Sequence, residues 1–221
     1  MKKKLKIVLF AYNFPHRKTI DFIDTIYNVG FEINLILAAN FIPIKSPKSA
    51  FILNAKKPKI SIQDKALQKN IPLYEVKHNS SESQYLLKKY NVNIGIIAGA
   101  RVLTFPVINL LSYGIVNFHP GLLPEIRGLD SILWSIYKDV PLGVTVHLIN
   151  EKIDAGFLVC QEKISIISSD NLQSLYEKNY QLQLKLIPIS LNLILKNPTF
   201  IALKMGNYNN RMSYKDQIGI M

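Results

Sequence analysis

The chain has 221 residues, a length that suits one compact domain with a buried core. No run of about 20 residues is apolar and free of charge, so we expect no membrane span. A single cysteine, Cys160, excludes an internal disulfide and a cysteine-cluster metal site, and it fits a cytoplasmic location. The net charge of +12 would suit an anionic partner, but the lysines are scattered, so we expect mostly solvated lysine and no nucleic acid partner.

The first forty residues predict a β-α-β unit. Residues 6–12 form an apolar run typical of a buried strand, residues 19–28 carry an apolar stripe at helical spacing, and residues 31–38 predict a second strand. A right-handed crossover between parallel strands is the usual form of this unit. The fold class is therefore α/β, an open, doubly wound and mostly parallel sheet.

Three basic residues lie between the first strand and the first helix. They are His16, Arg17 and Lys18, and sheets of this class usually bind ligands at that position. Their side chains are candidates for contact with a substrate phosphate. The alternative, a helix start with solvated bases, stays open.

The rest of the chain continues the alternation. Residues 41–58 are irregular and rich in proline and lysine, which leaves open whether they close over a ligand. The expected helices are 64–70, 81–90, 107–111, 129–138 and 171–195, and the expected strands are 73–76, 93–99, 114–119, 143–149 and, at the sheet edge, 159–167. We expect the last helix to bend or restart at Pro188.

Two residues at a strand end carry side chains that suit carbonyl chemistry. Asn117 and His119 are two apart on the strand 114–119, so both side chains point to one face. The turn 150–156 carries Asp154, which can fold back toward the histidine. In an addition to a carbonyl, the amide would donate to the developing oxyanion, the imidazole would manage the proton and the carboxylate would fix the ring's charge or tautomer.

These residues belong to a series of short motifs. The motifs are Asn117-x-His119-Pro120, Leu122-Leu123-Pro124, Arg127-Gly128, Gly143-Val144-Thr145-Val146-His147 and Ile153-Asp154-Ala155-Gly156. In order and spacing they resemble the folate-dependent formyltransferase superfamily, which includes glycinamide ribonucleotide, methionyl-tRNA and nucleotide-sugar formyltransferases. The resemblance implies a Rossmann-like core and transfer of a formyl group from 10-formyltetrahydrofolate to a primary amine, with Asn117, His119 and Asp154 as catalytic residues.

The resemblance also implies where the folate binds. Residues Arg101, Val102 and Leu103 match the segment whose backbone hydrogen-bonds the pterin in these enzymes, and Asn150, Glu151 and Lys152 complete the expected folate contacts. We expect no metal, because the four histidines show no ligand spacing.

The acceptor is chosen by elimination among the relatives. The glycine-rich phosphate loop of the purine enzymes is absent, and the tail 197–221 is too short to be the second domain that grips tRNA, so we expect a catalytic domain over 1–196 with a short extension. Arg127 either grips an acceptor phosphate or carboxylate or braces its turn. The expected acceptor is a nucleotide-linked amino sugar, a phosphate-bearing small molecule, and a homodimer is compatible with it. One alternative function is a phosphoribosylglycinamide formyltransferase of purine synthesis. The other is a non-catalytic folate- or nucleic-acid-binding relative.

Overall fold

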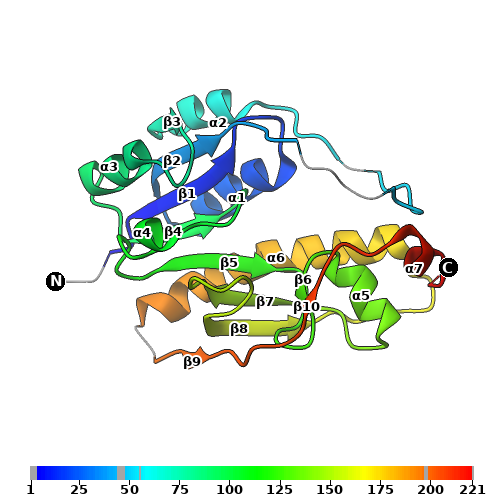
Figure 1. Cartoon of the computed structure of the whole chain (residues 1–221). Helices are drawn as coiled ribbons and strands as arrows, with labels where there is room; N and C mark the ends of the chain where they lie inside the picture. Colours follow the sequence, from blue (N-terminus) through cyan, green and yellow to red (C-terminus); the bar gives the residue numbers. More distant parts are fainter. Residues whose placement is uncertain (1–3, 44–47, 55, 197–198, 221) are drawn as a thin grey trace.

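One eight-stranded sheet organises the molecule, for which a computed structural model describes residues 4–43, 48–54, 56–196 and 199–220. The strand order is β3-β2-β1-β4-β5-β7-β8-β9 (Figure 1). The strands are β1 (Ile7–Tyr12), β2 (Ile33–Ala39), β3 (Leu73–Glu75), β4 (Ile94–Ile97), β5 (Ile115–His119), β7 (Gly143–Leu148), β8 (Phe157–Lys163) and β9 (Ile201–Ala202). A separate two-stranded ribbon pairs β6 (Arg127–Gly128) with β10 (Tyr208–Asn209).

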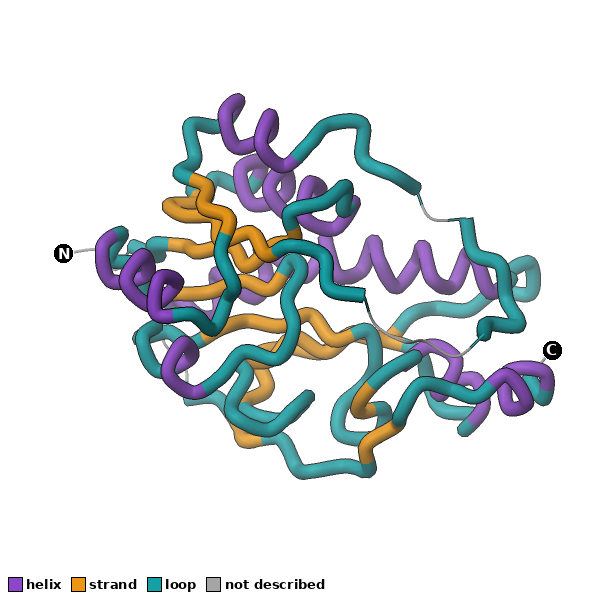
Figure 2. The backbone as a smooth tube through the Cα atoms, turned by 45° about the horizontal axis from the view of Figure 1, so that its top comes forward, coloured by secondary structure: helices purple, strands orange, loops and turns teal. Residues whose placement is uncertain are grey.

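Helices cover both faces of the sheet (Figures 1 and 2). They are α1 (Arg17–Asn28), α2 (Ile62–Gln68), α3 (Ser81–Lys89), α4 (Phe105–Ile108), α5 (Ser131–Tyr137), α6 (Leu172–Leu195) and α7 (Tyr214–Ile218). Alternate residues of β1 enter different cores, because successive strand side chains point to opposite faces. Ile7 and Leu9 pack with residues of α1, α2 and α6, whereas Val8 and Phe10 pack with residues of α3 and α4. The doubly wound α/β prediction is therefore confirmed.

The strand order reverses between β1 and β4, and ligands bind at such a switch point in open α/β sheets. Strands β1 to β5 are parallel to one another, whereas β7 runs antiparallel to both β5 and β8. The carboxyl ends of β1, β4 and β5 consequently share one edge of the sheet. The basic residues after β1, the Arg101 segment after β4 and His119 at the end of β5 all lie there.

One local expectation is wrong, and another is wrong in part. Strand β8 is not the sheet edge, because β9 from the C-terminal extension pairs with its first two residues, Phe157 and Leu158. Of the two outcomes expected at Pro188, a restart does not occur, because helix α6 runs through the proline, and a bend there stays an expectation. Proline removes one backbone donor there, and the buried side chains of Leu186, Ile187 and Leu191 hold the helix against the sheet on both sides of the gap.

The described part of the C-terminal extension, residues 199–220, is folded onto the domain (Figure 1). After β9 it crosses to β6, pairs with it as β10, and ends in α7. Its side chains Met212 and Gln217 are buried, at 0% and 4% exposed. Sequence patterns predicted only a short tail here, because two-residue strands carry no periodicity.

Removing one core aromatic ring is expected to destabilise the fold strongly. Phe22 of α1 and Phe118 of β5 are fully buried, with ring centroids 5.2 Å apart in an edge-to-face arrangement. Phe22→Ala should lower the free energy of unfolding by about 3–5 kcal/mol, measured by urea denaturation. Tyr85→Ala, at a side chain that is 62% exposed, is the control and should change it by less than about 0.5 kcal/mol. A loss at Phe22 no larger than at Tyr85 would contradict this packing.

Candidate functional site

Strand β5 presents Asn117 and His119 on the same face, the one that Ile115 shares with α3 and α4. The intervening Phe118 points into the opposite core. His119 is 3% exposed and Asn117 is half-buried, so the histidine lies under the surface while the amide reaches a cavity. The strand alternation that places them was readable from the sequence.

The loop after β7 brings Asp154 back to this face. Oδ1 of Asp154 lies 3.4 Å from Nδ1 of His119, and its Oδ2 accepts a 3.0 Å hydrogen bond from the peptide N–H of Gly128. Asp154 adopts a left-handed backbone conformation, with φ 45°. Burial alone would raise the pKa of its carboxyl, but the hydrogen bond and charge of His119, with the Gly128 N–H, lower that pKa below the usual value.

Both ring nitrogens of His119 face hydrogen-bond acceptors. Nε2 lies 2.7 Å from the carbonyl oxygen of Ile126, which can only accept, and Nδ1 faces the carboxylate of Asp154. A ring that carries a proton on each nitrogen satisfies both partners. The arrangement therefore suits a cationic imidazole held against a carboxylate.

A neighbouring histidine fixes the amide of Asn117. Nδ1 of His147 lies 2.9 Å from the carbonyl oxygen of Ala155 and must carry the proton there, so Nε2 accepts from Nδ2 of Asn117 at 3.2 Å. Burial and the charge of His119 lower the pKa of His147 to about 4, so the ring is neutral. One N–H of Asn117 is thereby occupied, and the second is left for the cavity. His147 is thus a positioning residue for Asn117.

A first pocket, of about 340 Å³, opens beside these side chains. It gathers nine of the residues selected from the sequence: Arg101, Val102, Leu103, Asn117, His119, Asn150, Glu151, Lys152 and Asp154. None of the peptide N–H groups of residues 101–103 donates to another residue in the described part of the chain. Its wall therefore offers free backbone donors.

A second pocket, of about 700 Å³, lies between the start of α1, residues 53–54 and 56–58, and helix α6. It contains the predicted His16, Arg17 and Lys18. Pro120, Asp130 and Ser131 line both pockets, and we call these three residues the junction. His119 directly precedes Pro120 of the junction, and Asp154 lies within 3.4 Å of its ring. The side chains of Asn117, His119 and Asp154 are therefore gathered where the two pockets meet.

The three basic residues after β1 differ in their partners. Burial and the neighbouring charge of Lys18 lower the pKa of His16 to about 4, so His16 is uncharged at neutral pH. Arg17 donates from both terminal nitrogens to Glu177 at 2.7 Å, which lowers the pKa of Glu177 to about 2. Lys18 makes no ion pair with any residue that the structure describes, and burial lowers its pKa to about 8. Lys18 is therefore the available cation of the three.

Arg127 lines neither pocket. Its Nε donates to the carbonyl of Ile153 at 2.7 Å, and Nη1 donates to the carbonyl of Gly206 at 3.2 Å. Of the two readings that the sequence left open, these contacts favour bracing of the turn, and contact with an acceptor stays a prediction.

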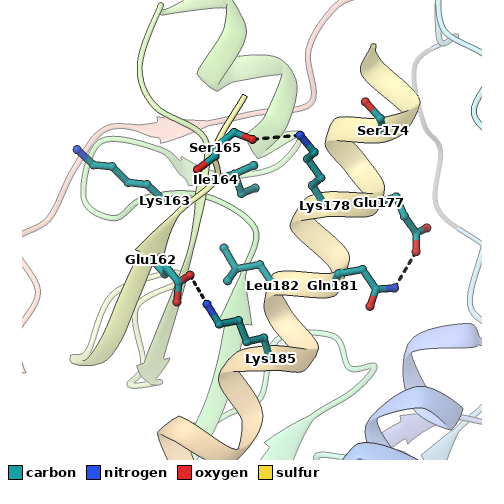
Figure 3. A pocket seen from close by; sticks show the side chains of 10 residues that line it. All are labelled: Glu162, Lys163, Ile164, Ser165, Ser174, Glu177, Lys178, Gln181, Leu182 and Lys185. Atoms are coloured by element: carbon teal, nitrogen blue, oxygen red, sulfur yellow. Dashed lines mark hydrogen bonds and ion pairs between the residues drawn. The ribbon is translucent and has the colours of Figure 1, made fainter. Parts of the chain in front are cut away.

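A third hollow of about 660 Å³, between β8 and the outer side of α6, contains none of the predicted residues (Figure 3). Lys185 reaches across it to Glu162 at 2.6 Å, and Lys178 donates to the carbonyl of Ser165 at 3.1 Å. Glu177 and Gln181 lie on the other side of the helix in this view (Figure 3). The charges of this hollow are thus largely paired within the protein.

Sequence reasoning missed two amides in the second pocket. Asn179 and Gln183 are 1% and 6% exposed, and they follow each other at one helical turn in α6. Nδ2 of Asn179 donates to the carbonyls of Pro120 and Gly143, so its oxygen accepts from Gln183 Nε2 at 2.9 Å. Two buried amides at this spacing on an apolar helix are a signal that the sequence carried.

Two properties of the described ranges bear on metal binding and on membrane insertion. These ranges contain no cluster of three or more histidine, cysteine, aspartate or glutamate side chains that could hold a metal ion. Within the same ranges, every helix is too short or too polar to cross a membrane.

Comparisons with known proteins identify the family from the sequence and match the fold from the structure. The family model described as formyl transferase matches residues 38–191. A methionyl-tRNA formyltransferase of Flavobacterium psychrophilum is 33% identical over 120 residues, which are 53% of this chain and 38% of that protein. This chain thus spans well under two thirds of that relative.

Solved structures share the fold at low sequence identity. A phosphoribosylglycinamide formyltransferase from Bacillus halodurans has a TM-score of 0.64 at 23% identity, covering 87% of this chain and 95% of that one. A sugar N-formyltransferase from a Shewanella species has a TM-score of 0.63 at 22% identity, covering 93% of this chain and 76% of that one. Formyltransferases of this family take their formyl group from 10-formyltetrahydrofolate. The family model covers well over half of the chain, and the chain belongs to the formyl transferase family.

Proposed function

We propose that this protein transfers a formyl group from 10-formyltetrahydrofolate to a primary amine of a nucleotide-linked amino sugar. The observation that carries the proposal is the meeting of two pockets beside Asn117, His119 and Asp154. A transfer between two molecules needs two binding sites that share one reaction centre. The folate is assigned to the first pocket and the amine to the second.

The free backbone groups of residues 101–103 support the first assignment. A pterin ring has donors and acceptors along one edge, and peptide groups without internal partners can match them. Asn150, Glu151 and Lys152 form the opposite wall. The folate supplies the formyl carbon that the amine attacks.

Asn117, His119 and Asp154 then stabilise the negative charge that develops on the formyl oxygen and transfer the protons. The second N–H of Asn117 donates to the formyl oxygen as negative charge develops there, and the cationic ring of His119 lies beside it. Nε2 of His119 must turn from the carbonyl of Ile126 to donate directly. The new bond joins amine nitrogen and formyl carbon. As the bond from that carbon to the folate nitrogen breaks, Asp154 accepts the amine proton and His119 returns one to the leaving nitrogen.

The second pocket suits a large anionic acceptor. Lys18, Lys56 and Lys57 lie along it with Tyr176 and Tyr180, so cationic and aromatic surfaces occur together. A diphosphate can bind the lysines and a base can stack on an aromatic ring. The volume of about 700 Å³ is sufficient for more than a single sugar ring.

The acceptor is identified by a panel assay. The protein and 10-formyltetrahydrofolate are incubated with amino-sugar nucleotides, with glycinamide ribonucleotide and with the unlinked amino sugars, and the formylated amide is detected by mass spectrometry. We expect product with at least one amino-sugar nucleotide and none with the sugar alone. If product forms with glycinamide ribonucleotide only, the acceptor is that ribonucleotide and not an amino-sugar nucleotide. The same lysines would then bind its phosphate.

Lys18→Met is expected to weaken binding of the acceptor without changing the affinity for the folate. A hydrogen bond to a charged group contributes about 1.5–3 kcal/mol, so KM for the phosphate-bearing acceptor should rise about 10- to 100-fold. Because the pKa of Lys18 is about 8, its charge is present at pH 7 and lost above pH 8, and the wild-type KM should rise over that range while the variant's stays flat. Lys88→Met, at an exposed lysine of α3, is the control. An unchanged acceptor KM in Lys18→Met would remove this contact.

The remaining alternative is a binding protein without catalysis. Affinity for nucleic acid that falls steeply with salt and ignores folate, with no amide formed from any amine, would favour it. A cytoplasmic location and a homodimer stay expectations from the sequence.

A further inference from the structure

The C-terminal extension touches the loop that follows His119 at several points. Residues 206–217, which we call the C-terminal clamp, run along the loop 120–131 and end at the segment 49–54 that enters the second pocket (Figures 1 and 2). Asn209 accepts from the peptide N–H of Leu129 at 2.8 Å, and β10 pairs in parallel with β6. The extension is therefore joined to the site through its backbone.

Close packing leaves no space between clamp and loop. Gly128 has φ 102°, and a Cβ added to it would lie 2.2 Å from the carbonyl oxygen of Asn209. A Cβ added to Gly206 would lie 1.8 Å from the carbonyl oxygen of Pro124. Glycine at both positions lets the two backbones meet.

The carboxylate of Asp130 is held on both oxygens by the clamp. Oδ1 accepts from Nη1 of Arg211 at 3.0 Å, and Oδ2 accepts from the peptide N–H of Met212 at 2.9 Å. Asp130 has a left-handed backbone with φ 50° and lines both pockets. An aspartate in that conformation is strained unless its surroundings hold it.

The same segment supports the catalytic carboxylate. Gly128, which packs on Asn209, donates its peptide N–H to Asp154. At the far end, Oε1 of Gln217 accepts from the peptide N–H of Ala50 at 2.8 Å, next to the residues of the second pocket. One short segment thus contacts Gly128, which supports Asp154, and Asp130, which lines both pockets.

We propose that the C-terminal clamp is a positioning element of formyl transfer, with Asp130 and Arg211 as positioning residues that fix the junction and the Gly128 N–H against Asp154. The inference rests on the proposed function. It predicts that loosening the clamp lowers the rate of the chemical step more than it lowers affinity, since displacement of a supporting group by about 1 Å can reduce a rate about 100-fold. The extension, on this account, is part of the active site's framework.

The test compares Arg211→Ala with Arg211→Lys and with Lys204→Ala, a control at an exposed lysine that precedes the clamp. The Arg211 side chain is 41% exposed, so its removal leaves the core intact. We expect Arg211→Ala to lower kcat about 10- to 100-fold with unchanged KM values, Arg211→Lys to restore most of the activity, and Lys204→Ala to match the wild type.

Amide hydrogen exchange of Gly128 and Leu129 provides a second readout that needs no substrate. Exchange at both amides should accelerate in Arg211→Ala while β1 and β4 amides keep their protection. Wild-type kcat with unchanged exchange in Arg211→Ala would overturn the proposal, as would faster exchange with unchanged kcat. If the wild type forms no amide with any acceptor, the proposed function fails, and exchange alone then decides whether the clamp holds this loop.

Discussion

His119→Ala is expected to lower kcat for formyl transfer by about 100- to 10,000-fold, the range that general acid–base groups contribute. In the proposed mechanism the ring carries the proton that the leaving folate nitrogen needs, and the carboxylate of Asp154 lies 3.4 Å from the ring. The kcat of Asp154→Asn should be lowered by a factor in the same range, because an amide cannot take the proton of the attacking amine. The measurement is steady-state absorbance of folate release with an amine that the panel assay has identified.

The same variants need a check on folding and on binding. His119 is 3% exposed and donates to the carbonyl of Ile126, so its loss also removes a buried contact. Thermal unfolding and the Kd of a folate analogue separate the two effects, since the first pocket's backbone donors are unchanged. A variant that is folded, binds folate and turns over at the wild-type rate would remove His119 from the mechanism.

Asn117→Ala should lower kcat by about 100- to 1,000-fold, the effect of removing one oxyanion donor. KM for the folate should change little, because the lost interaction strengthens only as charge develops. Rapid-quench measurement of a single turnover isolates this step from product release. A loss confined to KM would show that Asn117 binds the ground state and does not stabilise the oxyanion.

His147 provides the matched control for that experiment. His147→Gln keeps an acceptor for the amide of Asn117, whereas His147→Ala leaves the amide free to rotate. We expect the glutamine variant to retain more activity than the alanine variant, with equal folate affinity. Equal activities in both would mean that the orientation of Asn117 is fixed by other contacts.

Local patterns in the sequence were sufficient for the sheet and for two of the three catalytic candidates. Apolar strands separated by amphipathic helices predict a doubly wound sheet, because each face needs a helical cover. Asn117 and His119 are two residues apart on one strand, so their common face follows from strand geometry alone. Both features depend on neighbours in the chain.

Features that join distant parts of the chain were not readable in this way. Arg17 was a candidate phosphate ligand, yet its guanidinium binds Glu177, which lies 160 residues further on. The left-handed turn at Asp154 brings the carboxylate to His119, and the parallel pairing of β10 with β6 brings the extension to the site. Each of these depends on tertiary packing that no periodicity records.

The central claim is that a formyl carbon passes directly from folate to an amine bound in the second pocket. Its most direct test is ¹³C NMR with 10-formyltetrahydrofolate labelled at the formyl carbon, the protein, and each amino-sugar nucleotide in turn. The account predicts that the label moves to the amide of one acceptor and that His119→Ala leaves it on the folate. Label released only as formate, at a rate that no amine changes, would contradict it.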